Sequence, residues 1–278
     1  MKAYKGFDRN MRCRGFKFEE GKTYEEDKAE LCKTGFHACT NPLDVWRYYP
    51  PTDGCEYHEV ELEEVSEERN NDDSKVCGKR IRIGTKLGIE GIVNAFVSLC
   101  TKKTTSAKDA QCALIDNGKN FAQIGSSVDR AHIASSGEGA CIGSSGYETR
   151  IGSSGYKTCI GSSGDRLCVG SSGYKTCIAS SGKGARIASS GDEAQITSSG
   201  DEAQIASSGD VARIETLSTN CVMMCAGQNS RAKGKIGSWI VLTEWVNGKP
   251  NVVAKRIDGA SIKADVWYTL KSGQLQEV

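Results

Sequence analysis

An aliphatic residue returns every nine positions through the middle of the chain, and this spacing constrains the fold more than any other feature of the sequence. The twelve positions run from Ile115 to Ile214 without an insertion, and most units read Ile-(Gly/Ala)-Ser-Ser-Gly. A fixed short period is typical of a solenoid, in which each unit buries its apolar face only against its neighbours. Helical units are disfavoured, because Gly costs ~1 kcal/mol relative to Ala and Ser competes for backbone hydrogen bonds. The repeat therefore predicts short parallel strands joined by Ser-Ser-Gly turns.

The variable positions of the repeat indicate how many units close one coil. Residues 155–160 recur identically at 173–178, eighteen positions later. Because stacked neighbours in a solenoid tend to resemble each other, two units per coil are expected. A three-sided coil would break up the column of Cys141, Cys159 and Cys177. The predicted fold is therefore mainly β, a two-sided parallel β-solenoid with 18 residues per coil.

Strand alternation assigns each side chain to the inside or the outside of this roll. The aliphatic residue, the small residue two positions before it and the first Ser after it should point inward. The fifth residue counted from Ile is Gly from Gly137 to Gly209, and we expect a positive φ there. The residues just before the aliphatic positions should form two outer faces, one with Gln123, Cys141, Cys159, Cys177, Gln195 and Arg213, the other with His132, Arg150, Cys168, Arg186 and Gln204.

Flat outer faces of this kind suit docking against another surface, although a solvated wall without a partner is the alternative. The predicted binding residues are the arginines of these faces and the tyrosines of the turns, namely Arg150, Arg186, Arg213, Tyr147, Tyr156 and Tyr174. The arginines are too sparse for a groove that tracks phosphates, so direct nucleic-acid binding is not expected. Calcium-binding rolls carry Asp two positions before the aliphatic residue, where Thr158, Leu167 or Ala203 stands here, so the roll should need no calcium.

The segment before the repeat, residues 1–95, contains three of the four prolines and is expected to form a separate α+β domain. Strands are predicted at 1–7, 35–39 and 56–63. A short helix is predicted at 42–49, with Asn41 as its N-cap and Pro42 in its first turn.

The solenoid is expected over residues 96–216, and residues 217–278 are expected to leave the nine-residue register. An unpaired last strand needs a cover, so we interpret this segment as a β-strand cap, with an independent binding module as the alternative. Strands are predicted at 236–246, 251–257 and 261–270, with a hairpin turn at Asn247-Gly248 and a core of Trp239, Trp245, Trp267 and Tyr268.

Charge and cysteine usage exclude several classes of protein. The 36 Lys and Arg residues balance 35 Asp and Glu residues, which is not the charge of a strongly basic nucleic-acid binder. No apolar run reaches the ~18 residues of a membrane span, and the N-terminus lacks the pattern of a signal peptide, so a cytosolic protein is expected. The 13 cysteines include no CxxC pair and read as free thiols. A zinc site lacks the tight ligand spacing it would need among Cys13, Cys32, His37, Cys39, Cys55 and His58, so neither a metal nor another cofactor is predicted.

Five short motifs of the first domain carry a resemblance to a known group of proteins. They are Tyr-Lys-Gly-Phe from Tyr4, Cys-Arg-Gly-Phe from Cys13, Gly-Phe-His-Ala-Cys from Gly35, Asn-Pro-Leu-Asp-Val from Asn41, and Tyr48-Tyr49. This set resembles an uncharacterised bacteriophage and prophage family in which Ser/Gly repeats often follow. The resemblance implies a phage origin and the host bacterial cytoplasm, but it brings no established activity. From the head, the rigid roll and the cap, we expect a non-enzymatic binding protein that engages a host protein or protein–nucleic acid complex or assembles with itself. Family analogy points to an inhibitor of a nuclease-based host defence such as CRISPR-Cas.

The order of elements in the first domain also resembles that of ADP-ribosyltransferases. Tyr4, His37 and Glu61 would then be the catalytic residues. Lys5 stands where that family has Arg or His, and no Ser-Thr-Ser strand is present. An enzyme of this type is the alternative to a binding protein.

Overall fold

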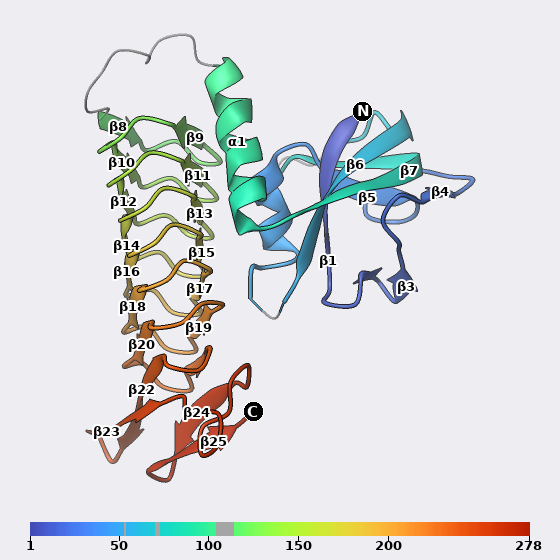
Figure 1. The fold of residues 1–278 in the computed structure, drawn as a ribbon. Coiled ribbons are helices and arrows are strands. Elements are labelled where there is room, and N and C mark those ends of the chain that lie inside the picture. The colour runs from blue at the N-terminus through green and yellow to red at the C-terminus, as the bar shows by residue number, and fades with distance from the viewer. Residues whose placement is uncertain (53, 70–72, 104–113) are drawn as a thin grey trace.

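The computed structural model describes residues 1–52, 54–69, 73–103 and 114–278, and it places a small α+β head beside a long β-solenoid (Figure 1). The head sheet has the strand order β4-β7-β5-β1-β6, and β7 also pairs with β6, so the sheet closes on itself. Its strands are β1 (Lys2–Phe7), β4 (Thr23–Glu25), β5 (Phe36–Cys39), β6 (Glu56–Val65) and β7 (Lys75–Leu87). A small hairpin stands apart from this sheet and consists of β2 (Arg12–Cys13) and β3 (Phe16–Lys17).

The predicted strands and the short helix of the head are present, but sequence reasoning missed β7, the short strands β2, β3 and β4, and a second helix. The short helix is a 3₁₀ helix, η1 (Pro42–Arg47), and Asn41 Oδ1 accepts a hydrogen bond from the Leu43 N–H at its start. The missed helix is α1 (Ile89–Lys103), which runs across the domain boundary expected at residue 95. Gly91 and several β-branched residues weaken its helical propensity, which packing against the solenoid overrides. Among the described residues, no helix is long and apolar enough to cross a bilayer.

The repeat forms a β-solenoid of about seven turns between residues 123 and 242. Each strand pairs in parallel with the strand 18 residues away, so Cys159 lies between Cys141 and Cys177. This register confirms the two-sided coil. Residues 104–113 of the expected solenoid range lie outside the described residues.

The two sides of the coil form two sheets. The first, here called the head-side sheet, contains β9 (Gln123–Ser126), β11 (Cys141–Ser144), β13 (Cys159–Ser162), β15 (Cys177–Ser180), β17 (Gln195–Ser198), β19 (Arg213–Thr216), β21 (Arg231–Lys233), β24 (Tyr268–Lys271) and β25 (Gln274–Glu277). The second, here called the open sheet, contains β8 (Leu114–Asn117), β10 (His132–Ser135), β12 (Arg150–Ser153), β14 (Cys168–Ser171), β16 (Arg186–Ser189), β18 (Gln204–Ser207), β20 (Val222–Cys225), β22 (Trp239–Val246) and β23 (Lys249–Arg256).

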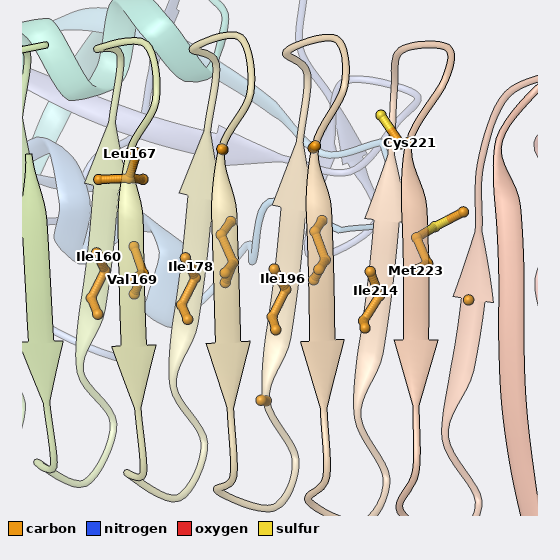
Figure 2. Packing of buried hydrophobic residues seen from close by; sticks show 14 of the residues in the cluster. Ile160, Leu167, Val169, Ile178, Ile196, Ile214, Cys221 and Met223 are labelled. Atoms are coloured by element: carbon orange, nitrogen blue, oxygen red, sulfur yellow. The ribbon is translucent and has the colours of Figure 1, made fainter. Parts of the chain in front are cut away.

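The interior of the roll is filled as the alternation predicts. Figure 2 shows Ile160, Ile178, Ile196 and Ile214 stacked in successive strands, and all four are fully buried. The Ala, Thr or Leu two positions before each aliphatic residue and the first Ser after it are buried as well. Burying one such Ile side chain stabilises the fold by roughly 1.5–3 kcal/mol, so each coil contributes its own share of the core.

The glycine that ends each Ser-Ser-Gly turn has a different role from the expected one. A Cβ atom on Gly155 would lie 2.0 Å from the carbonyl oxygen of Gly137, one coil earlier, and the other turns repeat this approach. Positive φ instead occurs two positions later, for example at Lys157 (53°) and Lys175 (58°). The predicted positive φ at Gly137 to Gly209 is therefore wrong, because close backbone stacking between coils is what excludes a side chain there.

The roll continues past the boundary expected at residue 216. Met223 pairs with Ile205, and Ala232 pairs with Ile214, so two further units keep the nine-residue register. A search for aliphatic residues overlooks them because Met and Ala take the inward position.

The C-terminal end adds two antiparallel hairpins to the sheets, β22–β23 and β24–β25. Asn247 (φ 50°) and Gly248 (φ 74°) form the first turn, as predicted. The predicted tryptophan core is wrong, because Trp239 and Trp245 are 44% and 45% exposed. The buried side chains of this end are instead Tyr268 together with Ile257, Ile262 and Leu270.

The head packs on the head-side sheet through η1 and α1. Leu43, Trp46, Val93 and Phe96 form one buried cluster with the cysteine column of that sheet. A Cβ atom on Gly143 would lie 2.4 Å from Phe96, whereas the described residues place nothing within 4 Å of one on Gly152 or Gly170 of the open sheet. The two sheets thus share a sequence pattern, but the head covers only the head-side sheet.

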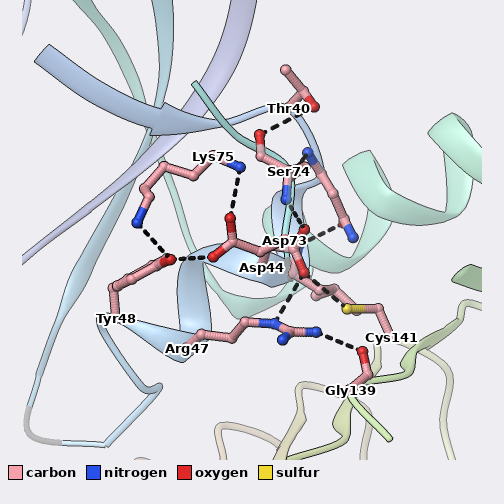
Figure 3. A network of polar contacts seen from close by, with 11 residues as sticks. Thr40, Asp44, Arg47, Tyr48, Asp73, Ser74, Lys75, Gly139 and Cys141 are labelled. Atoms are coloured by element: carbon pink, nitrogen blue, oxygen red, sulfur yellow. Dashed lines mark hydrogen bonds and ion pairs between the residues drawn. The ribbon is translucent and has the colours of Figure 1, made fainter. Parts of the chain in front are cut away.

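Polar contacts fix the head at the same interface (Figure 3). The Arg47 guanidinium lies 3.2 Å from Asp44 Oδ1 and donates a hydrogen bond of 2.5 Å to the carbonyl oxygen of Gly139. The Cys141 thiol donates to Asp44 Oδ1 at 3.3 Å, and Thr197 Oγ1 donates to the carbonyl oxygen of Pro51 at 3.0 Å. Because these contacts join head and solenoid over several coils, the two parts form one packed unit.

Candidate functional site

A groove of about 1490 Å³ runs along the open sheet and the turns that lead into it. Its floor consists of the side chains that precede each aliphatic residue of the open sheet, from His132 to Gln204. Its wall consists of the turns that connect each head-side strand to the next strand of the open sheet. The lining side chains that carry charge or rings are Asp129, Arg130, His132, Tyr147, Glu148, Arg150, Arg166, Arg186 and Glu202. Four arginines, three acidic side chains, one histidine and one tyrosine thus line a groove along the sheet that the head does not cover.

The floor of the groove carries Arg150 and Arg186 on either side of Cys168. Both arginines are exposed, and two ladder steps place their Cα atoms about 10 Å apart. Within the described part of the chain neither makes an ion pair. Two guanidinium groups therefore face the groove without a compensating carboxylate.

The wall of the groove holds a fixed charge network. Glu148 lies 3.2 Å from Arg130 and 3.4 Å from Arg166, one coil before and one coil after it. The Arg166 guanidinium also lies over the Tyr147 ring, 5.8 Å from its centroid. Glu148 is thus shared between two arginines, and the arginines of the whole lining outnumber its acidic side chains by four to three.

The structure brings together three of the six predicted binding residues. Arg150, Arg186 and Tyr147 line the groove, whereas Tyr156 and Tyr174 stack on the opposite edge with ring centroids 5.7 Å apart. Arg213 lies on the head-side sheet beside Gln195. Sequence reasoning missed Arg130 and Arg166, because the turn position they occupy holds Glu, Lys, Asn, Gly, Phe or Val in other units.

A second cavity, of about 680 Å³, lies in the head and is here called the head cavity. Residues from the motifs that carry the phage resemblance line it, including Lys5, Cys13, Arg14, His37 and Tyr49. Phe16, Phe18, Tyr24, Phe36 and Tyr48 contribute further rings to its lining. Motifs spread over nearly 50 residues of sequence therefore meet at one place in the fold.

Lys5 is the buried charge of the head cavity. It is 6% exposed, and its ammonium group donates to the carbonyl oxygen of His37 at 2.7 Å and contacts Cys13 Sγ at 3.6 Å. The ammonium also lies 5.6 Å from the centroids of Phe7 and Phe18. Burial lowers the pKa of Lys5, because the charged form loses its hydration.

The alternative catalytic residues are only partly brought together. Tyr4 and His37 line the head cavity, and His37 Nε2 accepts a hydrogen bond of 2.9 Å from the Cys32 N–H. Burial, and then the charge of Lys5, lower the pKa of His37, so its ring is a neutral hydrogen-bonding group. Glu61 points elsewhere, since it is exposed on β6, lies 3.5 Å from Arg82 and is outside the cavity lining.

Within the described residues, no three His, Cys, Asp or Glu side chains gather in a way that could hold a metal ion. The cysteines of the described ranges are free thiols. Burial raises the pKa of Cys225 to about 12 and that of Cys77 to about 11, which leaves both groups as neutral thiols.

Comparison with known proteins matches the head to one family and gives no further relative. Residues 1–95 match DUF7666, a domain of unknown function. No curated protein and no solved structure matches the chain. The match covers the segment that holds the head cavity and ends inside α1.

Proposed function

We propose that the chain is a non-enzymatic binding protein of bacteriophage type, whose open-sheet groove engages an acidic surface of a host protein. The observation that carries this proposal is that two sheets with the same sequence pattern have different surroundings. One is covered by the head, and the other presents Arg150 and Arg186 without carboxylate partners in the described chain. Unpaired arginines on a flat floor suit a partner that brings its own acidic groups, because complementary charge speeds encounter and selects the partner.

The rigid solenoid supports this role. Backbone hydrogen bonds link successive coils throughout the roll, so the groove residues keep a fixed spacing along it. A preordered surface loses little conformational entropy on binding. We propose that the partner is a host protein, alone or within a protein–nucleic acid complex. The resemblance of the head motifs to a phage family supports the host bacterial cytoplasm as the compartment of the encounter. Inhibition of a nuclease-based defence such as CRISPR-Cas is the specific activity that we propose.

Capture from bacterial lysate at low and high salt tests the groove, with Arg186→Glu and Lys157→Glu as a matched pair. Both changes reverse one exposed charge, but Lys157 lies on the opposite edge of the roll. We expect a protein that is retained by the wild type and by Lys157→Glu, and lost with Arg186→Glu and at high salt. If the two variants retain the same proteins, the groove is not the binding surface.

A plasmid-interference assay in cells that carry CRISPR-Cas tests the proposed activity. Expression of the wild type should rescue a targeted plasmid, and Arg186→Glu should fail to do so. Rescue that is equal for both proteins would separate inhibition from the groove, and absence of rescue would refute this activity.

An ADP-ribosyltransferase-like activity is the second candidate, because Tyr4 and His37 share the head cavity. Incubation with labelled NAD and host lysate tests it. Label transfer that is lost in Glu61→Gln would favour the enzyme, although Glu61 lies outside the cavity lining.

A further inference from the structure

We propose that the head cavity binds a nucleotide, with the base among its aromatic rings and the phosphate near Lys5 and Arg14. This site is separate from the groove, so the proposal does not depend on the function proposed for the groove. It concerns the same cavity as the second candidate function, but nucleotide binding there requires no transferase activity. It follows from three observations: the lining of the cavity, the buried ammonium group and the use of the neighbouring acidic groups.

The rings of the cavity offer a stacking surface. Phe16, Phe18 and Tyr24 contact each other edge to face, with centroids 4.8–5.5 Å apart. Phe18 is buried, but Phe16 is 53% exposed although it belongs to this cluster. Exposing a large ring beside a cavity costs hydrophobic free energy, and a flat aromatic ligand that covers it would recover that cost. The cavity volume of about 680 Å³ is in the range that holds small organic ligands.

The buried ammonium group of Lys5 has no negatively charged partner within the described residues, so an anionic ligand would stabilise it. Its two hydrogen-bond acceptors, a carbonyl oxygen and a thiol, and the Phe7 and Phe18 rings beside it are all neutral, and no carboxylate lies within ion-pair distance of it in the described chain. An ammonium group has three N–H donors, so it can also donate to a ligand. A buried charge without an opposite charge is expensive, and it is typical of a site where a ligand supplies that charge.

The acidic side chains that line the cavity are already engaged. Glu25 pairs with Arg80 at 3.2 Å. Glu26 accepts hydrogen bonds from Thr34 Oγ1 at 3.1 Å and from the Gly35 N–H at 2.9 Å. These contacts hold the carboxylates away from Lys5, so they do not neutralise it.

Four cationic side chains line the cavity, and two of them, Lys33 and Lys75, are already engaged: Lys33 pairs with Glu30 at 3.4 Å, and the Lys75 ammonium donates to Tyr48 Oη at 3.1 Å. Arg14 is the second cation, after Lys5, that makes no ion pair within the described residues. It sits at the tip of the β2–β3 hairpin, where Arg14 (φ 51°) and Gly15 (φ 83°) form the turn. Its charge acts against that of Lys5 and helps burial to lower the pKa of Lys5. Two cations that repel each other are stabilised together by a dianion, and a phosphate monoester carries about −1.5 to −2 charges at neutral pH. This count favours a phosphate over a single carboxylate.

Close packing around the cavity shows how the local sequence shapes it. A Cβ atom on Gly6 would lie 2.7 Å from Tyr49, so only glycine lets the Tyr49 ring lie against β1. Gly35 has a φ of 88°, and a Cβ atom there would lie 2.8 Å from Cys77 Sγ. Glycine on β1 and glycine before β5 thus keep the walls of the cavity in place.

Fluorescence titration of the full chain with mant-AMP, a fluorescent nucleotide, tests the site. We expect saturable binding that AMP displaces, while adenosine and ribose 5-phosphate, which lack the phosphate or the base, compete at least 10-fold more weakly. Competition by adenosine as strong as by AMP would overturn the role of the cations, and absence of binding at millimolar mant-AMP would overturn the site.

Variants separate the site from general effects of charge. Lys5→Gln and Arg14→Gln should each weaken mant-AMP binding about 10-fold or more, since a charged hydrogen bond is lost in each. Lys17→Gln, on the outer part of the same hairpin and outside the cavity lining, should leave binding unchanged. Arg14 is exposed, so its variant stays folded even if Lys5→Gln does not. Equal affinity of Arg14→Gln and Lys17→Gln would refute the proposal.

Discussion

Ala194→Thr should stabilise the solenoid, because it would complete a hydrogen-bond pattern that three nine-residue units already have. In those units a buried Ser hydroxyl donates to a Thr hydroxyl five residues later, as in Ser153–Thr158 (3.2 Å) and Ser171–Thr176 (3.1 Å). Where Ala takes the place of Thr, five buried Ser Oγ atoms have no hydrogen-bond partner within the described residues, namely those of Ser135, Ser180, Ser189, Ser198 and Ser207. Ser126 differs, because its Oγ accepts from the Val128 N–H at 3.2 Å. Ala194 is the residue that leaves Ser189 in this state.

The expected gain follows from the geometry at Thr176, which occupies the same place one coil earlier. Thr176 Oγ1 accepts from Ser171 and donates to the carbonyl oxygen of Gly173 at 2.8 Å. A Thr at position 194 should make the same two bonds. Each bond contributes a net ~0.5–1.5 kcal/mol, and fixing the added side chain removes part of this. A rise of about 1 kcal/mol in the free energy of unfolding remains, which corresponds to roughly 2–4 °C in Tm.

Thermal and guanidinium unfolding, followed by circular dichroism, measure this effect. Ala194→Val is the matched control, because Val has the shape of Thr without the hydroxyl group. We expect Ala194→Thr to exceed both the wild type and Ala194→Val in stability. If the Thr and Val variants unfold together, the buried serines are not short of partners and the reasoning fails.

Further predictions address the turns, the interface, the cap and metal. Gly155→Ala should destabilise the chain by ~3 kcal/mol or more, because its Cβ would lie 2.0 Å from a carbonyl oxygen, whereas Gly152→Ala should be nearly neutral in denaturant titrations. Gly161→Leu should detach the head and speed limited proteolysis between the two parts, and Gly170→Leu on the open sheet should not, since only Gly161 lies under Val93 and Trp46. The Ser261 hydroxyl and nearby backbone N–H groups lower the pKa of Asp258 below its usual 3.8. This carboxylate therefore stabilises the fold above pH 3.8, and the stabilisation is lost as the pH falls further. In Asp258→Asn the Tm should fall less between neutral and acid pH than in the wild type. Treatment with EDTA should leave Tm unchanged, and a calcium-dependent Tm would contradict a roll built without calcium.

Much of the solenoid could be predicted because a short period repeats the same local environment. Once two units close a coil, the positions of Ile160 and every equivalent residue follow from strand alternation. The reason for Gly155 could not be predicted, since it depends on how closely the backbone of one coil approaches the next. From local sequence alone, a glycine in a turn is explained by its tolerance of positive φ. Gly155 does not have positive φ, so this explanation is wrong here.

The candidate groove was within reach of sequence reasoning only in part. Tyr147 and Tyr156 lie nine residues apart, which is half of one coil. In a two-sided coil they must therefore lie on opposite edges, so the sequence alone shows that they cannot belong to one site. Arg130 and Arg166 carry no such signal, because they gain their role from contacts with Glu148 across coils. The head cavity is still less predictable, since it forms from short motifs that only the tertiary fold brings together.

The outer faces of the solenoid also explain which sheet the head covers. On the head-side sheet the cysteines at 141, 159 and 177 are small and uncharged, and they are buried in one cluster with Trp46. On the open sheet Arg150 and Arg186 occupy the equivalent positions. Burying either guanidinium under apolar side chains would cost several kcal/mol for the charge alone. The arginines at 150 and 186 therefore direct the head to the sheet that carries cysteines under the head, so Cys159→Arg should expel the head from its own sheet without creating a second groove.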